Sequence, residues 1–336
     1  MILVREGLEP PEHTEHMSEE EIINAPWKTE YDVAVTLEER GYEVKVLGIY
    51  DKLAALRTTM EEFKPHIAFN LLEEFAGEVQ YDHRVVTYLE MLKVPYTGCN
   101  PKGLMISRDK ALTKKLLAYH RIRVPHFSVF PLRRRVRRPK RLQFPLFVKS
   151  VVEDASLGIS QTSLVKSDAG LVARVGFVHE QTGTDAIAEE FIEGRELYVG
   201  VIGNKRLETL PVWELFFEKQ PDDRPLIATA RAKWNSNYQK KWGITSRKAT
   251  DIPDRLYAQI KAWSKRIYRI LGLSGYARFD FRLTPEGVLY FLDANPNPQL
   301  AYGEDFAESA EQAGIAYPEL LRRIISLGLR SKSRVG

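Results

Sequence analysis

Two acidic side chains and an amide occur at the ends of two segments that alternate like β-strands. Residues 276–283 and 287–292 alternate apolar and polar side chains, and a turn with proline and glycine joins them. A hairpin of this length would bring Asp280, Asp293 and Asn295 to one place. Such hard oxygen ligands suit Mg2+, which shares its coordination with substrate phosphates. The pattern therefore predicts a magnesium site, and the alternative, a solvated hairpin end, is equally compatible with these residues alone.

A lysine at the end of an apolar segment is the second candidate. Residues 144–148 are typical of a buried strand, and Lys149 follows them directly. Ser156 and Gly158 come shortly afterwards, and small residues let backbone N–H groups approach an anion closely. Together these features predict a clamp for nucleotide phosphates. The alternative is an ordinary strand end followed by a surface turn.

A third segment, residues 186–200, is an apolar strand that breaks at Glu189 and Glu190, turns at Gly194 and then resumes. Such a break can expose backbone N–H and C=O groups to the edge of an adenine ring. A carboxylate a few residues later can accept the hydroxyl groups of a ribose. Adjacent acids at a strand end are more often simply solvated, so this pattern is weak when it is taken alone.

Taken in chain order, these segments resemble the ATP-grasp superfamily, and most closely the D-alanine–D-alanine ligase group, over residues 69–327. The resemblance includes residues 94–99 and 108–115, which match segments that those ligases have before their middle domain. It implies a mixed α/β and α+β chain with the ATP-grasp fold, in which ATP lies between two small sheets. The expected parts are an N-terminal parallel α/β subdomain, a central small lobe and a C-terminal ATP- and metal-binding lobe, at residues 1–100, 101–188 and 189–330.

The resemblance also implies roles for individual residues. The contacts expected for the ATP phosphates are Lys110, Lys149 and Ser156. Those expected for adenine and ribose are Glu189, Glu190, Ile192 and Glu196. The ligands expected for two Mg2+ ions are Asp280, Asp293 and Asn295. Lys233 would lie on a flexible lid near the γ-phosphate, and Arg278 would stabilise an acyl phosphate and a tetrahedral intermediate.

Two departures affect the amino-acid pockets rather than the ATP apparatus. Residues 69–78 stand where D-alanine–D-alanine ligases usually carry a His-Gly and acidic-Gly loop that helps to bind the first D-alanine. Pro298 and Gln299 stand where those ligases usually have a Pro-Gly step near the acceptor amine. We therefore expect the reaction class to be kept and the amino-acid substrates to differ.

The resulting hypothesis is an ATP-dependent carboxylate–amine ligase that acts through an acyl phosphate on amino acids or short peptides. Its partners would be a small-molecule carboxylate and a small-molecule amine, and a homodimer is left open. One alternative is a true D-alanine–D-alanine ligase of cell-wall synthesis. The other is a catalytically silent nucleotide-binding scaffold, which the retention of Lys149, Asp280, Asp293 and Asn295 disfavours. Such a ligase needs no protein nucleophile, in agreement with the lack of a Ser-His-Asp or Cys-His pattern.

The composition is that of a globular enzyme. The chain has 336 residues, 44% hydrophobic and 28% charged, enough to bury a core in two or three subdomains. Its single cysteine, Cys99, excludes an internal disulfide framework and favours a reducing cytoplasm, and we expect a structural thiol there. No apolar run approaches the roughly 18 residues of a membrane-spanning helix. The apolar run at residues 1–4 is too short for a signal peptide.

Residues 133–141 form a basic run that dominates the charge of the chain. The run contributes seven positive charges, so the rest of the chain carries a net charge of −3 instead of +4. An anionic partner, such as nucleic acid, a polyanionic substrate or a membrane surface, is one interpretation. The run lacks the interleaved aromatic residues of proteins that stack on single strands. We therefore expect a solvated loop and no binding of nucleic acid or membrane.

The first hundred residues alternate short strands with helices, which predicts βαβ units and a parallel sheet. The expected strands are residues 1–4, 42–48, 67–71 and 94–97, and the expected helices are 29–40, 52–63 and 82–92. Further helices are expected at 101–119 and, amphipathic, at 252–271. Residues 224–247 lack a strong apolar period and are predicted to form the lid loop. The long polar segment 6–28 is predicted to cover the donor pocket.

Overall fold

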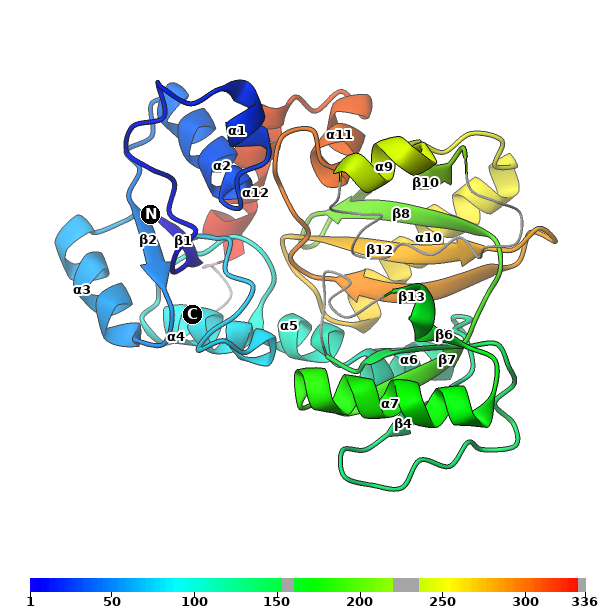
Figure 1. Ribbon diagram of the computed structural model, residues 1–336. Helices are drawn as coiled ribbons and strands as arrows, with labels where there is room; N and C mark the ends of the chain where they lie inside the picture. Colours follow the sequence, from blue (N-terminus) through cyan, green and yellow to red (C-terminus); the bar gives the residue numbers. More distant parts are fainter. Residues whose placement is uncertain (153–159, 220–235, 332–336) are drawn as a thin grey trace.

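A computed structural model describes residues 1–152, 160–219 and 236–331, which form three β-sheets with helices packed on them (Figure 1). The N-terminal sheet is parallel, as predicted. Its strands run in the order β2-β1-β3, with bounds Val46–Ile49, Ile2–Arg5 and Phe69–Asn70. The predicted strand at 94–97 is reduced to a single bridge between Ala68 and Tyr96. Pro95 shortens the pairing because it has no amide hydrogen to donate.

The helices of this part lie close to the predicted ranges. They are α2 (Lys28–Glu39), α3 (Leu53–Phe63) and α4 (Asp82–Met91). The segment before α2 is not a loop throughout, because it contains the short helix α1 (Glu19–Ile23). Ser18 caps α1 by accepting a hydrogen bond from the backbone N–H of Glu21, and the Glu21 carboxylate accepts one from the backbone N–H of Ser18.

The single helix predicted for residues 101–119 is wrong in one respect, since the chain breaks it at Asp109. Helix α5 covers Pro101–Arg108 and helix α6 covers Lys110–Tyr119. Asp109 has an extended backbone (φ −83°, ψ 94°), and its carboxylate accepts a hydrogen bond from the N–H of Leu112. Asp109 is therefore the N-cap of α6. The break directs Lys110, in the first turn of α6, toward the sheets.

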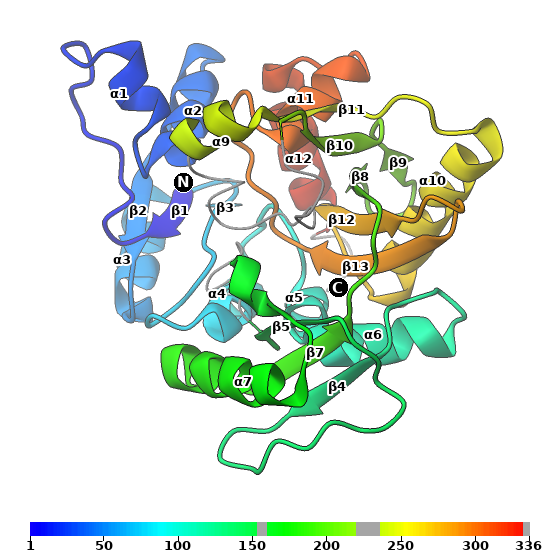
Figure 2. The same ribbon diagram turned by 45° about the vertical axis from the view of Figure 1, so that its right-hand side comes forward.

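The central sheet is antiparallel and has the order β4-β7-β5-β6. Its strands are β4 (Phe127–Phe130), β5 (Leu146–Ser150), β6 (Leu164–Val165) and β7 (Ala186–Glu190). Helix α7 (Asp168–Thr182) lies along one face of this sheet (Figure 2) and packs against Leu146 and Val148. Because side chains alternate along a strand, Phe147 and Lys149 extend from the opposite face. The basic run lies in the loop between β4 and β5, where Arg138 pairs with Asp168 at 2.7 Å.

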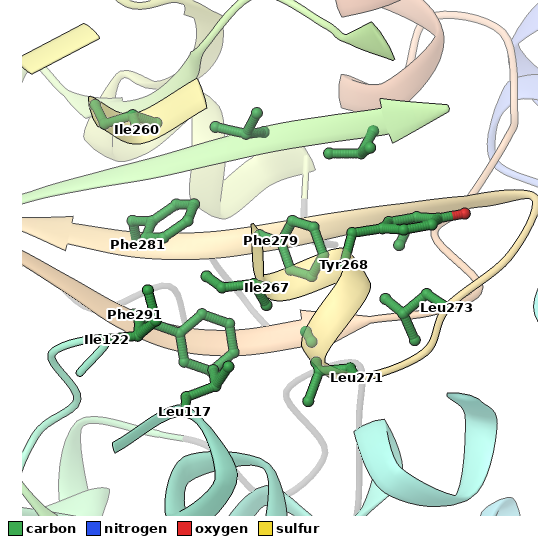
Figure 3. Packing of buried hydrophobic residues seen from close by; sticks show 14 of the residues in the cluster. Leu117, Ile122, Ile260, Ile267, Tyr268, Leu271, Leu273, Phe279, Phe281 and Phe291 are labelled. Atoms are coloured by element: carbon green, nitrogen blue, oxygen red, sulfur yellow. The ribbon is translucent and has the colours of Figure 1, made fainter. Parts of the chain in front are cut away.

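The large sheet is antiparallel and has the order β11-β10-β8-β12-β13, with β9 paired to β8. Its strands are β8 (Arg195–Ile202), β9 (Glu208–Thr209), β10 (Trp213–Phe217), β11 (Ile244–Lys248), β12 (Tyr276–Leu283) and β13 (Leu289–Asn295). Helix α10 (Asp254–Ile270), close to its predicted range, covers one face. Figure 3 shows the resulting core, in which Ile267 and Tyr268 of α10 pack against Phe279 of β12.

Gly194 forms the predicted turn between β7 and β8, and a larger residue would not fit there. Its φ is +139°, and an added Cβ would lie 2.0 Å from the carbonyl oxygen of Leu283. Both the backbone conformation and the close approach therefore require glycine. This turn carries the chain directly from the central sheet into the large sheet.

The C-terminal helices return to the N-terminal sheet. Helix α11 covers Asp305–Gln312, and α12 covers Tyr317–Ser331 and lies beside α2 (Figure 1). Leu320 and Ile324 of α12 share one buried cluster with Ile2 of β1. The two ends of the described chain are thus joined in one core. None of the helices in the described ranges combines the length and apolar character that crossing a membrane requires.

The described end of the predicted lid is ordered into regular structure, which corrects the expectation of a loop throughout 224–247. It forms α9 (Ser236–Trp242) and β11, which pairs along its whole length with β10. Only Ile244 of β11 is buried. The apolar period is therefore missing because β11 is an edge strand held mainly by backbone hydrogen bonds. Lys233 lies outside the described residues.

Candidate nucleotide and substrate site

The three sheets meet around one cavity of about 890 Å3. Its size is within the range of pockets that hold a small-molecule ligand. The predicted site residues that line it are Lys110, Lys149, Glu189, Glu190, Ile192, Glu196, Arg278, Asp280, Asp293 and Asn295. The other two predicted residues, Ser156 and Lys233, lie outside the described part of the chain. The structure thus brings together residues that are up to 185 positions apart in the sequence, Lys110 and Asn295.

The predicted metal ligands lie on one face of the β12–β13 hairpin. Asp280 and Asp293 are directly opposite each other in the register, and Arg278 is opposite Asn295. Side chains of opposite residues in an antiparallel pair project from the same face. Arg278 Nε donates to Asp280 Oδ1 at 2.9 Å, and the Arg278 guanidinium lies 4.8 Å from the centre of the Tyr198 ring.

The donor set of this face fits a magnesium ion that is shared with a nucleotide. Two carboxylates and one amide oxygen leave coordination positions that phosphate oxygens can fill. Within residues 1–152, 160–219 and 236–331, no group of three or more His, Cys, Asp or Glu side chains is arranged to hold a metal ion alone. A magnesium ion at Asp280, Asp293 and Asn295 would therefore depend on the nucleotide for the rest of its ligands.

Three lysines surround Asp293. Lys110 Nζ and Lys149 Nζ each lie 3.6 Å from Asp293 Oδ2, and they come from α6 and β5 respectively. Burial by itself would raise the pKa of Asp293, but the charges of Lys110, Lys149 and Lys114 outweigh it and hold the pKa below its ordinary value. The lysines gather positive charge at the point where the central and large sheets face each other. Such a cluster suits the phosphates of a nucleotide.

Lys114 is a site residue that the sequence interpretation did not select. Its side chain is fully buried, its Nζ lies 3.3 Å from Glu189 Oε1, and it also contacts the backbone carbonyl oxygen of Leu292. Burial lowers the pKa of Lys114, and Glu189 opposes that effect. The available signal was its position four residues after Lys110, on the same face of one helix.

The predicted adenine-binding segment has its acidic side chains occupied. Glu189 Oε1 lies 3.5 Å from Lys149 as well as near Lys114. Glu190 accepts a hydrogen bond from the N–H of Gln143 at 2.8 Å. A base edge at this segment would therefore meet the backbone, with Ile192 as an apolar wall of the cavity.

Glu196, the predicted ribose contact, is held in place by two neighbours. It is directly opposite Arg282 across β8 and β12, and the two side chains form an ion pair at 2.6 Å. The hydroxyl of Tyr198 donates to Glu196 Oε1 at 2.8 Å. Glu196 is only 8% exposed, so these partners compensate a buried charge and orient it at the cavity wall.

The N-terminal segment 6–28 and the altered position Gln299 also contribute to the wall of this cavity. Leu8, Ile23 and Pro26 of that segment line it, and the covering of a donor pocket by residues 6–28 stays a prediction. Gln299 also lines it, and its Nε2 donates to Thr29 Oγ1 of α2 at 3.2 Å. The hydrogen bond of Gln299 thus links the segment that follows β13 of the large sheet to α2 of the N-terminal part.

Cys99 lies outside the cavity and behaves as a structural thiol, as expected. It is 2% exposed, and burial raises the pKa of its thiol to about 12. At neutral pH the thiol is protonated and therefore a poor nucleophile.

Comparison with known proteins places this geometry in a family. Residues 116–326 match the family model described as the D-ala D-ala ligase C-terminus. A protein of Sinorhizobium fredii named "Uncharacterized protein y4sG" is 32% identical over 306 residues, which cover 89% of this chain and 86% of that protein. The D-alanine–D-alanine ligase of Desulforudis audaxviator is 29% identical over 301 residues, which cover 88% of this chain and 90% of that ligase.

Solved structures agree on the fold. The D-alanine–D-alanine ligase of Bacillus anthracis, in a crystal structure complexed with ATP, superposes with a TM-score of 0.75 at 22% identity. The match covers 100% of this chain and 98% of that chain. The ordered motifs, the three-sheet architecture with the ATP-grasp fold, and the extent of the family match agree. This chain belongs to the D-alanine–D-alanine ligase family and is a ligase of that type.

Proposed function

We propose that this protein is an ATP-dependent carboxylate–amine ligase that joins amino acids or short peptides through an acyl phosphate. The observation that carries the proposal is the convergence of Lys110 and Lys149 on Asp293, which is directly opposite Asp280. Lysines and carboxylates from separate sheets meet where a nucleotide phosphate chain and its metal would lie. The ATP complex of the Bacillus anthracis ligase, which has the same fold, supports a nucleotide in this cavity.

The residues of the chain would divide the binding of ATP among them. Lys110 and Lys149 would neutralise phosphate oxygens, with Ser156 and Lys233 as further contacts that lie outside the described residues. The backbone of 189–192 would contact adenine, and Glu196 would accept the ribose hydroxyls. Asp280, Asp293 and Asn295 would hold two Mg2+ ions, which offset phosphate charge when they are bound.

The reaction would proceed in two steps within this site. A substrate carboxylate oxygen attacks the γ-phosphorus, the bond from that phosphorus to the bridging oxygen breaks, and ADP leaves. The amine of the second substrate then attacks the acyl carbon, loses a proton, and expels inorganic phosphate. Arg278, fixed by Asp280 and stacked on Tyr198, would stabilise the negative charge of the acyl phosphate and the tetrahedral intermediate.

In this proposal the enzyme has three lobes, at residues 1–100, 101–188 and 189–330. In this arrangement the central lobe would supply Lys149 and the C-terminal lobe would supply Asp280 and Asp293. The substrates would be a small-molecule carboxylate and amine in a cytoplasmic setting. Separation of the lobes would admit ATP, and their approach would exclude water from the acyl phosphate.

A second candidate, D-alanine–D-alanine ligation itself, is favoured by relatives at 29% identity that are named D-alanine–D-alanine ligase. The altered segment 69–78 and Gln299 oppose it, because residues of both line the cavity and depart from the family's usual amino-acid loops. A silent scaffold is opposed by the lysine and carboxylate network, since buried charges are costly to maintain without a ligand.

Phosphate release from ATP and Mg2+ tests the proposal when D- and L-amino acids and dipeptides are supplied in pairs. We expect release, with a peptide product seen by mass spectrometry, for at least one pair. Lys149→Met should abolish that release. ATP binding without turnover for any pair would contradict the ligase proposal and support the scaffold.

A further inference from the structure

The wall that the N-terminal part and the start of α11 contribute to the cavity carries an excess of negative charge. Six acidic residues belong to it, which are Glu30, Glu73, Glu74, Glu304, Asp305 and Glu308. Arg5 lies among them and is 3.5 Å from Glu74. The central part of the chain thus contributes lysines to the cavity, and the N-terminal part and the start of α11 contribute mainly carboxylates. Arg278, which is paired with Asp280, also interacts electrostatically with Asp305 and Glu304.

Glu30 is the most buried of these acidic residues. It projects from α2, lines the cavity and is only 5% exposed. In the described ranges its carboxylate makes no hydrogen bond or ion pair with the side chain or backbone of another residue. Buried carboxylates are normally paired, because an isolated ionised one is strongly disfavoured. The Glu30 carboxylate therefore has no side-chain partner in the described ranges, and a ligand in the cavity can provide one.

The electrostatics of this region agree with a missing cation. Burial raises the pKa of Glu30 to about 7, and Glu73 and Asp32 add to the effect while Arg5 opposes it. Burial and the neighbouring Asp305 also raise the pKa of Glu304, although Lys28 and Arg278 oppose that rise. Carboxylates that repel one another and hold protons become fully ionised once a cation is bound between them.

The chemistry of the cation follows from the arrangement of the acids. They are not grouped as metal ligands, since no metal-binding cluster of three His, Cys, Asp or Glu side chains occurs in the described chain. An ammonium group suits them better, because it has three N–H donors and no acceptor. An organic ammonium with an aliphatic chain also fits a cavity whose lining includes the apolar residues Leu8 and Ile23.

We propose that a substrate of this enzyme carries a second, non-reacting ammonium group, as in a basic amino acid, and that Glu30 binds this group with help from Glu304. The inference rests on the proposed ligase function, whose reacting carboxylate and amine would lie nearer to Arg278. Glu30 is then a specificity residue that selects substrates with a cationic side chain over neutral ones.

Calorimetric binding separates this inference from the ligase proposal, because it needs no turnover. The protein is saturated with a non-hydrolysable ATP analogue and Mg2+ and titrated with both enantiomers of lysine and of norleucine, which lacks only the side-chain amine. Ornithine and norvaline repeat the comparison at a shorter length. We expect at least tenfold tighter binding of lysine or ornithine than of its neutral analogue.

Glu30→Gln removes the charge and keeps the shape of the side chain. It should reduce the preference for the cationic ligand to less than threefold and leave the affinity for the neutral analogue unchanged. Glu304→Gln should weaken the same preference, and it replaces Glu30→Gln as the test if that variant does not fold. Glu62→Gln, an exposed acid on α3 outside the cavity, is the matched control and should change nothing.

Three results would overturn the inference. One is equal or weaker binding of the cationic ligands, including binding of none of them. The other is loss of both members of a pair in Glu30→Gln, which would assign Glu30 to the α-ammonium group that the pair shares. Phosphate release with neutral amino acids but not with basic ones would also reject the inference and leave the ligase proposal intact.

Discussion

Lys149 Nζ lies 3.6 Å from Asp293 Oδ2, although Lys149 is on β5 of the central sheet and Asp293 is on β13 of the large sheet. This ion pair therefore spans the cavity between the two sheets. Asp293 also faces Lys110, so one carboxylate joins α6, β5 and β13. The side chain of Asp293 is 24% exposed, which leaves it accessible from the cavity. A phosphate with its metal could thus enter the same network.

Asp293→Asn should abolish turnover with little change of fold. The substitution removes the charge that faces the lysines and a proposed metal ligand, and we expect kcat to fall by about 100-fold or more. Stability should fall by less than the roughly 3–5 kcal/mol of a fully buried broken pair, because the side chain is partly exposed. Steady-state phosphate release and urea unfolding measure the two effects. Asp51→Asn, an exposed acid outside the cavity, should behave as wild type, and retained turnover in Asp293→Asn would refute its assigned role.

Lys114→Met should impair the use of ATP, although Lys114 was not expected as a site residue. Its ammonium lies beside Glu189 and, with Lys149, holds that carboxylate in place. We expect kcat/KM for ATP to fall by about tenfold or more, since one hydrogen-bonded charge is worth about 1.5–3 kcal/mol. Lys115→Met is the control, because Lys115 is the next residue of α6 and is exposed. Equal kinetics for the two variants would show that Lys114 has no part in ATP binding.

The pKa of Glu30 predicts a pH dependence of stability. Folding raises this pKa from an ordinary 4.5 to about 7, so between these values the folded chain keeps a proton that the unfolded chain has lost. Stability from this group therefore falls as the pH rises from 4.5 to 7, by about 3 kcal/mol in total, and stays lower above pH 7.

Glu30→Gln should remove that slope and make the chain more stable than wild type at pH 8. Urea unfolding of both proteins at pH 5, 6, 7 and 8 gives the measurement. Glu62→Gln should keep the wild-type slope. Parallel curves for Glu30→Gln and wild type would mean that the Glu30 carboxylate titrates normally in the folded protein.

D-alanine should be a poor substrate. The segment 69–78 and Gln299 replace the family's usual amino-acid loops, and residues of both line the cavity. We expect the formation of D-alanyl-D-alanine to be at least tenfold slower than ligation of the preferred pair. Mass spectrometry of the products at millimolar amino acid provides the comparison, and rapid dimerisation of D-alanine would instead favour a true D-alanine–D-alanine ligase.

Local patterns in the sequence were enough to predict the parts of the site that lie on single elements. The hairpin with Asp280 and Asp293 follows from two alternating segments and a turn, and Lys149 follows from an apolar strand. The turn at Gly194 is equally local, because backbone conformation and glycine content are properties of a few neighbouring residues. The order of these motifs was sufficient to identify the family.

Only the tertiary structure decided which distant residues meet. Lys114 of α6 and Glu189 of β7 pair although they are far apart in the sequence. Glu30 gains its unusual environment because α2 and the loop before α11 close over the same cavity. Burial and the pKa of a carboxylate depend on groups that arrive from other parts of the chain, and helical or strand periodicity carries no information about those groups. The polar residues that a single strand or hairpin contributes to a site are therefore predictable from the sequence. Their partners from other elements depend on how the lobes pack.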